Sequence, residues 1–507
     1  MYYTSKGWGI IQEIFSYTSK NVIFDSKVVN QLKFIEKQSL FILIMCLLVP
    51  LAVPYPITGY IATVLMLVFI GINKKNLLLI LFIYFPARPL LMELNSGLTY
   101  TGDLIILTLF ISLLMENFKK YEWQISKYHF TVPFWLFCLV GAVAGLLNGV
   151  GIFPILFELR ALLVTFLLLY IIGELNLERK DIFRFLKVIL IFTIFLCLHG
   201  ILEKIFSRTI LLPHEWEMWN LSPTNRMRIY GAPANPNVFA LFLSIQLFLS
   251  FFLFQSLKKY KPFVFLASIL LSGTLLLTYS RGTMIAFGFA ALVFIIWTRN
   301  KSFLKYAVGA FGLGLLLIYY PVLFASSKVE VSASVPMENM EIGSTPTSEH
   351  EHALSNRFSE MFSNTTLHQS TEWGRLYVLI KGLEIFKDHP ITGTGLATFG
   401  DSATLSFSSP IYQEYKIGER MYTDNQYIQI LVQTGVLGFL AVLAFILFTY
   451  RKIIKSRNGT LAVFTICLML AALLAGLFYN ILEDKTFTLF FYSCLGFCLQ
   501  KDIILKD

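Results

Sequence analysis

The sequence predicts an all-α fold of the polytopic membrane class, with about 12 to 14 transmembrane helices and one long extracytoplasmic loop. Hydrophobic residues make up 56% of the chain, and the mean hydropathy is +0.67. Both values lie well above those of soluble proteins. Apolar segments of roughly 20 residues, long enough to cross a bilayer, recur throughout. A single polar stretch, residues 325–426, interrupts them.

Fourteen apolar segments are candidate spans, and they divide the chain into four parts. We expect a cytoplasmic segment (1–38), a transmembrane bundle (39–324), an extracytoplasmic loop with acceptor-side helices (325–426), and C-terminal spans with a short cytoplasmic tail (427–507). The first span is expected to serve as its own insertion signal. The candidate spans are about 39–54, 56–72, 76–92, 101–116, 130–151, 156–176, 183–206, 237–256, 261–279, 281–298, 303–324, 427–450, 460–479 and 484–500.

The positive charges predict which loops face the cytoplasm. The formal net charge of +10 does not indicate a nucleic-acid partner, because lysines and arginines stand in short clusters between spans, all on one side. Such clusters mark the cytoplasmic side. The segments left outside are about 93–100, 207–236, the junction at Ser280 and Arg281, and the long loop. The clusters are Lys74–Lys75, Lys119–Lys127, Arg179–Arg184, Lys258–Lys261, Arg299–Lys301 and Arg451–Arg457.

Neither a metal site nor a cofactor is predicted. All six cysteines lie in apolar segments without metal-ligand spacing. Residues 349–352, Glu-His-Glu-His, could chelate a metal, but they stand in a Ser-, Glu- and Pro-containing stretch. A solvated charge run is the better interpretation there.

The second half of the long loop has a globular composition. From Trp373 to Phe386, apolar residues at 376, 379, 380, 383 and 386 have the spacing of an amphipathic helix. Pro390 ends this helix, and a glycine-rich turn over 392–400 follows. We expect this part to dock as a cap over the outer face of the bundle.

Three arginine-bearing clusters on the outer side are candidates for binding phosphate. Arg160 follows Glu158 near the outer end of the sixth span, Arg226 and Arg228 precede the eighth, and Arg281 begins the tenth. Guanidinium groups bind phosphate oxygens bidentately and keep their charge in apolar surroundings. Helix N-termini after Asn237 and at Arg281 would add favourable dipoles. The alternative is that these arginines anchor at the interface or pair with acids such as Glu158.

The helix that follows the long loop has two interpretations. Thr423 or Asp424 is an ordinary N-cap residue, which by itself needs no further role. Gln426, Gln429 and Gln433, however, form a polar stripe at i, i+3 and i+7 where the helix enters the bilayer. A polar cavity or a sugar-binding groove would explain this stripe. Similarly, His199 and Glu203, at i and i+4 in the seventh span, are either a buried pair or simply polar residues within the core.

Several motifs, in this order, resemble the O-antigen ligase/polymerase superfamily, which includes Wzy-type polysaccharide polymerases. The similarity covers roughly residues 150–450. The motifs are Arg228–Asn237, Ser280–Gly282, Trp373–Arg375 with Asp388–Pro390 and Gly393–Gly395, and Asp424–Gly438.

The resemblance implies a metal-independent, GT-C-like glycosyltransferase that acts outside the cytoplasmic membrane. Its donor would be a glycan on undecaprenyl pyrophosphate, and its acceptor a sugar hydroxyl. Arg228 and Arg281 match the arginines that bind pyrophosphate in the family. Arg160, Arg226 and Arg375 are expected to support substrate binding, together with the following asparagines and glutamine: Asn235, Asn237, Asn425 and Gln429.

One residue departs from the family pattern. Ligases of the family carry a histidine, the proposed general base, where this chain has Asp424, so either Asp424 takes over this catalytic role or the base lies elsewhere. A carboxylate of ordinary pKa is a weak base for a sugar hydroxyl, although carboxylates do activate nucleophiles in inverting sugar chemistry. The substitution favours a polymerase over a ligase. A lipid-linked oligosaccharide transporter is a third hypothesis, but such proteins show internal repeats and polar groups at mid-bilayer, and neither is evident in this sequence.

Overall fold

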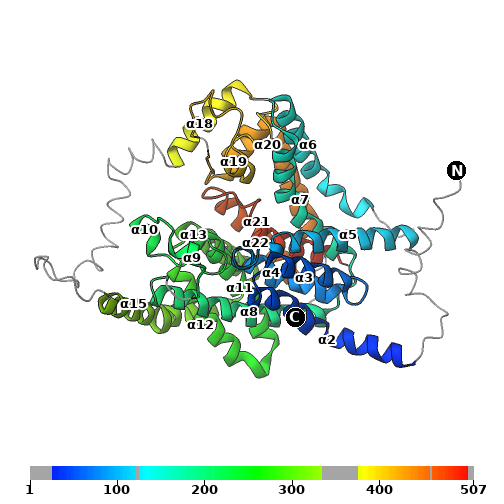
Figure 1. Ribbon diagram of the computed structural model, residues 1–507, viewed down its shortest axis with the longest axis vertical. Coiled ribbons are helices and arrows are strands. Elements are labelled where there is room, and N and C mark those ends of the chain that lie inside the picture. Colours follow the sequence, from blue (N-terminus) through cyan, green and yellow to red (C-terminus); the bar gives the residue numbers. More distant parts are fainter. Residues whose placement is uncertain are drawn as a thin grey trace, which may run out of the picture. The chain divides into compact units, whose positions relative to one another are not determined.

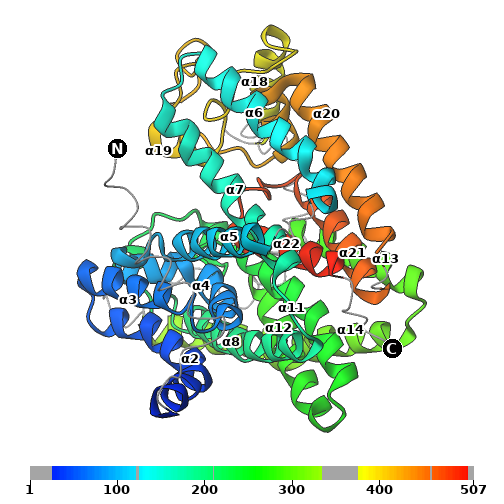
Figure 2. The same ribbon diagram turned by 90° about the vertical axis from the view of Figure 1, so that its right-hand side faces the viewer.

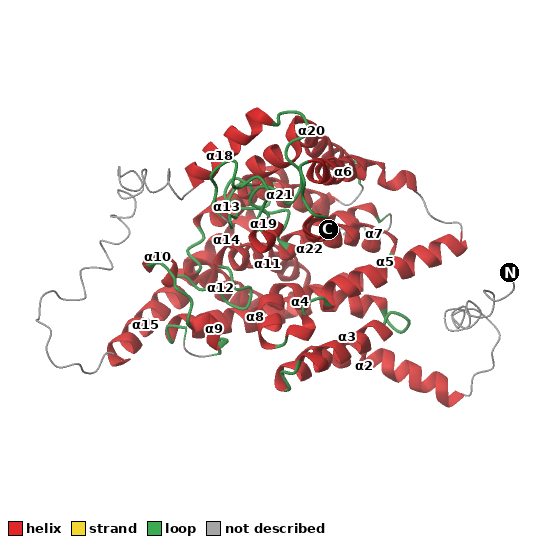
Figure 3. Cartoon of the chain, turned by 45° about the horizontal axis from the view of Figure 1, so that its top comes forward, coloured by secondary structure: helices red, strands yellow, loops and turns green. Residues whose placement is uncertain are grey.

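The structure is a computed structural model that describes residues 26–120, 125–208, 211–333, 375–418, 420–456 and 459–500. Within these ranges all regular structure is helical (Figure 3). Ten of the described helices are long and apolar enough to cross a membrane, and four shorter apolar helices accompany them. Each of the fourteen predicted spans coincides with one of these helices. The all-α polytopic membrane class is therefore confirmed.

The chain divides into two compact units, residues 1–116 and 117–507. In the first unit, Asn95 fastens the turns between helices: its side chain donates to the Pro50 carbonyl (2.9 Å) and accepts from the Gly97 N–H (3.0 Å). The helices of this unit are α2 (Ser26–Ala52), α3 (Pro56–Val68), α4 (Lys74–Leu94) and most of α5 (Thr101–Lys120). None of the predicted site residues belongs to it.

The second unit contains every predicted site residue. Within it, α6, α7, α18, α19 and α20 lie together on one side, α8, α11 and α12 lie on the other, and α21 and α22 lie between them (Figures 1 and 2). Long packed pairs include α6 with α20, α7 with α22, and α13 with α21. The helices are α6 (Val132–Leu147), α7 (Ile152–Glu174), α8 (Arg179–Ile205), α9 (His214–Glu217), α10 (Pro223–Arg226), α11 (Pro236–Ser256), α12 (Lys261–Leu277), α13 (Arg281–Thr298), α14 (Lys301–Gly314), α15 (Tyr320–Ala333), α18 (Arg375–Asp388), α19 (Ser402–Phe407), α20 (Gln426–Ile454), α21 (Gly459–Ala475) and α22 (Lys485–Leu499).

Helix α20 is broken at Gly435, where the sequence predicted one continuous span. The backbone of Gly435 is left-handed, with φ +59° and ψ −161°. The break frees two N–H groups, and the segment after α18 accepts both: Val436 N donates to the Pro390 carbonyl (2.9 Å) and Leu437 N to the Ile391 carbonyl (3.1 Å). A broken membrane helix is stable only when its freed backbone groups are satisfied in this way.

The glycine-rich turn after Pro390 satisfies the carbonyls on the other side of the break. Thr394 N donates to the Val432 carbonyl (2.9 Å), and Gly395 N donates to the Gln433 carbonyl (2.7 Å). Gly395 has φ +102°, and a Cβ atom there would lie 1.9 Å from the backbone nitrogen of Gly145 in α6. The turn therefore packs tightly between α6 and α20, and only glycine fits at position 395.

The predicted helix after Trp373 is present as α18, but a different face of it is buried. Gly382 lets α18 approach α20 so closely that a Cβ atom there would lie 2.3 Å from Cγ1 of Ile428. The glycine side of the helix, with Val378 and Ile385, therefore packs inward. Three of the five predicted positions are exposed instead: Leu379, Ile380 and Leu383.

Candidate functional site

Arg228 joins the loop before α11 to the end of α12. Its Nε donates to the Thr278 carbonyl (2.9 Å), and its Nη2 donates to Oδ1 of Asn237 (2.7 Å). Ile229 N also donates to the Leu277 carbonyl (3.3 Å). Arg228 as a whole is half-buried, and these hydrogen bonds hold its guanidinium in place.

Asn237 is the point where two of the predicted motifs meet. Its Oδ1 accepts from Arg228 and also from the Ser280 hydroxyl (2.8 Å). Asn235 caps α11 by accepting from the N–H groups of Asn237 (2.8 Å) and Val238 (3.3 Å). Both asparagines thus shape the site directly. Their contact with a substrate remains a prediction.

Arg281 is the first residue of α13 and is exposed. Three residues separate it from the end of α12, and Tyr279 makes the reversal with φ +52°. Because Arg281 directly follows Ser280, the Ser280–Asn237 hydrogen bond brings the Arg281 and Arg228 motifs together. The N-terminus of α13 lies at the same place and favours an anion there.

A buried ion pair supports the Arg228 loop from below, and sequence reasoning missed it. Glu203, at the end of α8, accepts from the N–H groups of Tyr230 (3.1 Å) and Gly231 (2.6 Å). Arg208 Nη1 lies 3.2 Å from a Glu203 carboxylate oxygen. The Arg208 guanidinium also lies over the rings of Trp219 (5.1 Å) and Tyr230 (4.5 Å). Glu203 was noticed in the sequence beside His199, whereas its partner lies in the following loop.

The remaining predicted arginines occupy other places. Arg226 ends the short helix α10 and is exposed. Arg160 is half-buried on α7, with its guanidinium 4.7 Å from the centre of the Phe157 ring. Arg375 begins α18, and its side chain lies outside the described part of the chain, as do Trp373 and residues 349–352.

Asp424 precedes α20 and is exposed. The N-cap of α20 is neither Thr423 nor Asp424, as the sequence suggested, but Asn425. Its Oδ1 accepts from the N–H groups of Tyr427 (3.0 Å) and Ile428 (3.1 Å). Because Asn425 caps the helix, the Asp424 carboxylate is not needed for that purpose.

The predicted glutamine stripe of α20 faces a buried hydrogen-bond network. Gln426 donates to Oε1 of Gln429 (2.7 Å), and Gln429 in turn donates to Glu483. Gln433 donates to Asp401. All three glutamines are buried, Gln429 to 2% exposure. Contact between Gln429 and a substrate therefore requires these hydrogen bonds to open.

Buried carboxyl groups accept from this network. Burial raises the pKa of Glu483 to about 7, and the nearby Asp401 carboxylate adds to the rise. Burial also raises the pKa of Asp401, against hydrogen bonds from Thr404 and Ala397 that lower it. A third carboxyl, Glu158 of α7, is 1% exposed and interacts electrostatically with both. Repulsion between neighbouring carboxylates disfavours the ionised form of each.

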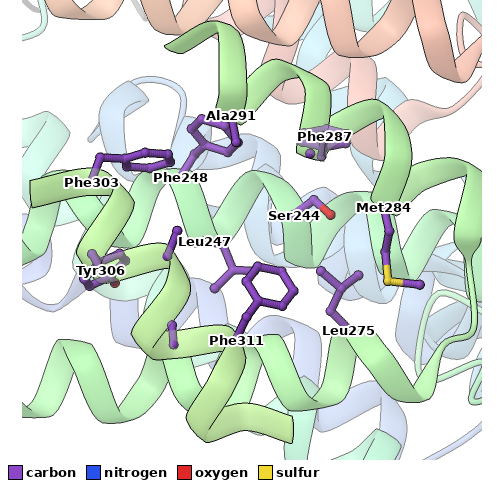
Figure 4. Close-up of a pocket in the computed structure, with 13 residues that line it drawn as sticks. Ser244, Leu247, Phe248, Leu275, Met284, Phe287, Ala291, Phe303, Tyr306 and Phe311 are labelled. Atoms are coloured by element: carbon purple, nitrogen blue, oxygen red, sulfur yellow. The ribbon is translucent and has the colours of Figure 1, made fainter. Parts of the chain in front are cut away.

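An apolar cavity of about 150 Å³ lies between α11, α12, α13 and α14 (Figure 4). Met284, Gly288 and Ala291 line it from α13. They follow Arg281 by three, seven and ten residues, a spacing that places them on one helix face with it. The polar side chains in the wall are already bonded: Ser244 donates to the Ala240 carbonyl, and Tyr306 donates to Ser250.

These features define a multi-pass α-helical membrane protein in which arginine-bearing loops meet at helix ends. The model of a family described as O-antigen ligase matches residues 266–443, and this similarity supports the resemblance to the O-antigen ligase/polymerase superfamily. The match supports a glycosyltransferase-like activity of the ligase or polymerase type. It includes Arg281 and Asp424 and begins after Arg228. A search of curated proteins finds no match.

Proposed function

We propose that this protein polymerises lipid-linked polysaccharide repeat units. It transfers a glycan from undecaprenyl pyrophosphate to a sugar hydroxyl of another lipid-linked repeat, on the outer side of the cytoplasmic membrane. The observation that carries the proposal is that Asn237 bonds both Arg228 and Ser280, the residue before Arg281, with an apolar cavity on the same face of α13 as Arg281.

The arginines fit the pyrophosphate part of such a donor. Arg228 and Arg281 stay charged throughout the accessible pH range and present planar forks to phosphate oxygens. The N-terminus of α13 adds its dipole at the same place. Negative charge develops on the leaving pyrophosphate, and fixed cations at that position stabilise the transition state. This role of the arginines is why the proposed reaction is metal-independent.

The cavity fits the lipid part of the donor. It begins one helical turn beyond Arg281, so a phosphate held at the arginine would leave the polyprenyl chain beside the cavity. Apolar walls with internally bonded polar groups favour a hydrocarbon occupant.

The reaction breaks the bond between the anomeric carbon and the pyrophosphate oxygen, and forms one from that carbon to the acceptor oxygen. The acceptor hydroxyl loses its proton, and the bonding electrons depart with the pyrophosphate. Asp424, exposed at the start of α20, is the proposed group that orients the hydroxyl and takes its proton. Most of the acceleration would come from positioning and electrostatics.

The proposed partners follow from this reaction. They are the undecaprenyl-pyrophosphate-linked oligosaccharide, the glycan acceptor and the surrounding membrane lipid. A chain-length regulator or a flippase is a further candidate, since the repeat units must reach the outer side and the polymer must stop growing. Nucleic acid is not among the proposed partners.

A ligase is the second candidate, because the matched family is described as O-antigen ligase. Such an enzyme would use the same donor site and transfer the finished glycan to a lipid, wall polymer or protein. The arginine site serves both reactions equally. The acceptor distinguishes them.

The test is the glycan size distribution of cells that carry Arg281→Ala, with expression and membrane insertion verified. Collapse of long polymer to single repeat units supports a polymerase that uses Arg281. Normal polymer length with lost attachment to the acceptor favours the ligase. An unchanged profile would overturn the role of Arg281.

A further inference from the structure

The short loop between α21 and α22, residues 476–484, contacts both halves of the proposed site. It lies beyond residue 443, where the family match ends, and no role was predicted for it. Figures 1 and 2 show α21 and α22 between the group of α18, α19 and α20 and the group of α11 and α12. The loop is therefore placed to connect the Asp424 segment with the arginine site.

On one side, the loop packs against the start of α13. Gly282, the residue after Arg281, lies so close to Phe478 that a Cβ atom there would be 3.0 Å from Cγ of the ring. The next residue, Thr283, shares a hydrogen bond of 3.5 Å with the Tyr479 hydroxyl. Thr283 also accepts from Ser280 (2.9 Å). The loop thus reaches the residues that flank Arg281.

On the other side, the loop holds the first turn of α20. Gln426 N donates to the Gly476 carbonyl (2.8 Å), and Leu482 N donates to the Gln426 side chain (2.9 Å). Tyr427 donates through its hydroxyl to the Leu473 carbonyl at the end of α21 (2.5 Å). The helix that follows Asp424 is fixed to α21 and to the loop by backbone and side-chain bonds.

Asn480 makes the contact nearest to Asp424. Its Oδ1 accepts from the Thr423 hydroxyl (3.0 Å), and its Nδ2 donates to the Gly400 carbonyl (3.0 Å). Thr423 itself donates to the same carbonyl through its N–H (2.8 Å). Thr423 is fully buried and Asn480 is 2% exposed. The Asn480 amide therefore bridges Thr423 and Gly400, and it adds to the bonds that Thr423 makes directly to the Gly400 carbonyl through its N–H and its hydroxyl (3.0 Å).

We propose that Asn480 is a positioning residue of the transfer reaction. From a loop that also packs beside Arg281, it fixes Thr423, so that the exposed Asp424 carboxylate keeps its place relative to the donor arginines. The inference rests on the proposed function for the reaction itself, whereas the restraint on Thr423 is independent of it. Proper placement of a reacting group contributes strongly to rate, and small displacements cost much of it.

The restraint is tested by spin labelling of the full-length protein in nanodiscs. A nitroxide on Arg420→Cys, an exposed position, reports on the segment before Thr423. Cys46→Ala removes the half-buried native cysteine, and the other five are buried. We expect Asn480→Ala and Thr423→Val to increase the mobility of the label. Thr423→Ser keeps the hydroxyl and should give the wild-type spectrum.

Asn300→Ala is the matched control, since Asn300 caps α14 through one hydrogen bond to Phe303 N (3.1 Å) and does not contact this loop. It should leave the label spectrum unchanged. A wild-type spectrum in Asn480→Ala overturns the proposed restraint.

The second arm measures polymer formation per folded protein, together with binding of undecaprenyl pyrophosphate. We expect Asn480→Ala to reduce polymer formation by about ten-fold or more with unchanged lipid binding, and the conservative variant Thr423→Ser to form polymer as the wild type does. Partial unfolding would instead reduce polymer formation and lipid binding in parallel. Increased mobility with full polymer formation overturns the positioning role. A failure of the proposed function shows separately, as full polymer formation in Arg281→Ala.

Discussion

Glu203 and Glu483 are buried carboxyl groups that support the two halves of the proposed site in different ways. Glu203 lies beneath the Arg228 loop and is paired with the Arg208 guanidinium at 3.2 Å. Glu483 lies beneath the first turns of α20 and accepts from Gln429 and Ser402, which are uncharged. Its close charged neighbours, Asp401 and Glu158, are acids.

The difference teaches how each half should respond to change. A buried carboxylate paired with arginine depends on that counter-charge, and the pair fails when one partner is removed. A carboxyl that faces other acids is sensitive to pH instead, because protonation relieves both burial and repulsion. We therefore expect the arginine half to depend on charge pairing and the α20 half to depend on protonation.

The largest effect should come from breaking the ion pair. Arg208→Ala leaves the Glu203 carboxylate buried without its guanidinium, and we expect the free energy of unfolding to fall by about 3–5 kcal/mol. Arg226→Ala, at an exposed arginine nearby, should change it by less than about 0.5 kcal/mol. Unfolding of the purified protein in detergent measures both. Replacing both partners, as Glu203→Leu with Arg208→Leu, should recover much of the loss. Equal stability of Arg208→Ala and Arg226→Ala would show that the ion pair is unimportant.

Next in size is the loss of Arg228 as a donor ligand. We expect Arg228→Ala to reduce glycan transfer by about 100-fold or more, the usual cost of losing a group that stabilises developing charge. Arg228→Lys should recover only part of this, since lysine lacks the bidentate fork. Arg226→Ala should stay within about ten-fold of wild type by the same reasoning. Transfer is measured per folded protein, and comparable losses in Arg226→Ala and Arg228→Ala would contradict a specific role for Arg228.

The protonation of Glu483 predicts a smaller, pH-dependent effect. Burial and Asp401 raise the pKa of Glu483 from 4.5 to about 7, so between these values the folded protein holds more protons than the unfolded chain. This contribution to stability is complete below about pH 4.5 and is lost as the pH rises through about 7. Thermal unfolding between pH 5 and 8 should show the loss, and Glu483→Gln should flatten it. An equally steep profile in Glu483→Gln would assign the titration to its neighbours Asp401 and Glu158.

The smallest effect is expected at the apolar cavity. Gly288 lines it, and no atom lies within 4 Å of a Cβ atom built there. Gly288→Leu should therefore fill the cavity without disturbing the fold and lower transfer several-fold by excluding the polyprenyl chain. Gly312 on α14 also has open space around it and is not among the cavity residues, so Gly312→Leu is the control. If both variants transfer at the same rate, the cavity does not hold the donor lipid.

Local hydropathy determined what the sequence could predict. The ten long apolar helices, the four shorter ones and the tight α12–α13 junction at Arg281 follow from runs of apolar residues in the described part of the chain, because each run must be buried or face lipid. The arginine motifs stand out as candidate site residues in the sequence for a related reason, since charges beside spans are conspicuous. The contact that unites them, Asn237 with Ser280, joins residues more than forty positions apart and left no periodic signal.

The missed features depend on partners distant in sequence. The break at Gly435 needs carbonyls from Pro390 and Ile391. The buried face of α18 is the one with Gly382, because this glycine allows a close approach to α20. Likewise, Asn480 and Glu483 stand between two short apolar segments, where a turn explains them equally well. Their pairing with Thr423 and Gln429 arises only in the folded chain.

The central claim, a pyrophosphate site at Arg281, is tested most directly by native mass spectrometry of the purified protein with undecaprenyl pyrophosphate. Undecaprenyl monophosphate serves as the comparison lipid, and Arg299→Ala, at the opposite end of α13, as the control variant. We predict that the wild type and Arg299→Ala bind the pyrophosphate more tightly than the monophosphate, and that Arg281→Ala weakens pyrophosphate binding by about ten-fold or more. Equal binding of both lipids, or unchanged binding in Arg281→Ala, would contradict the claim.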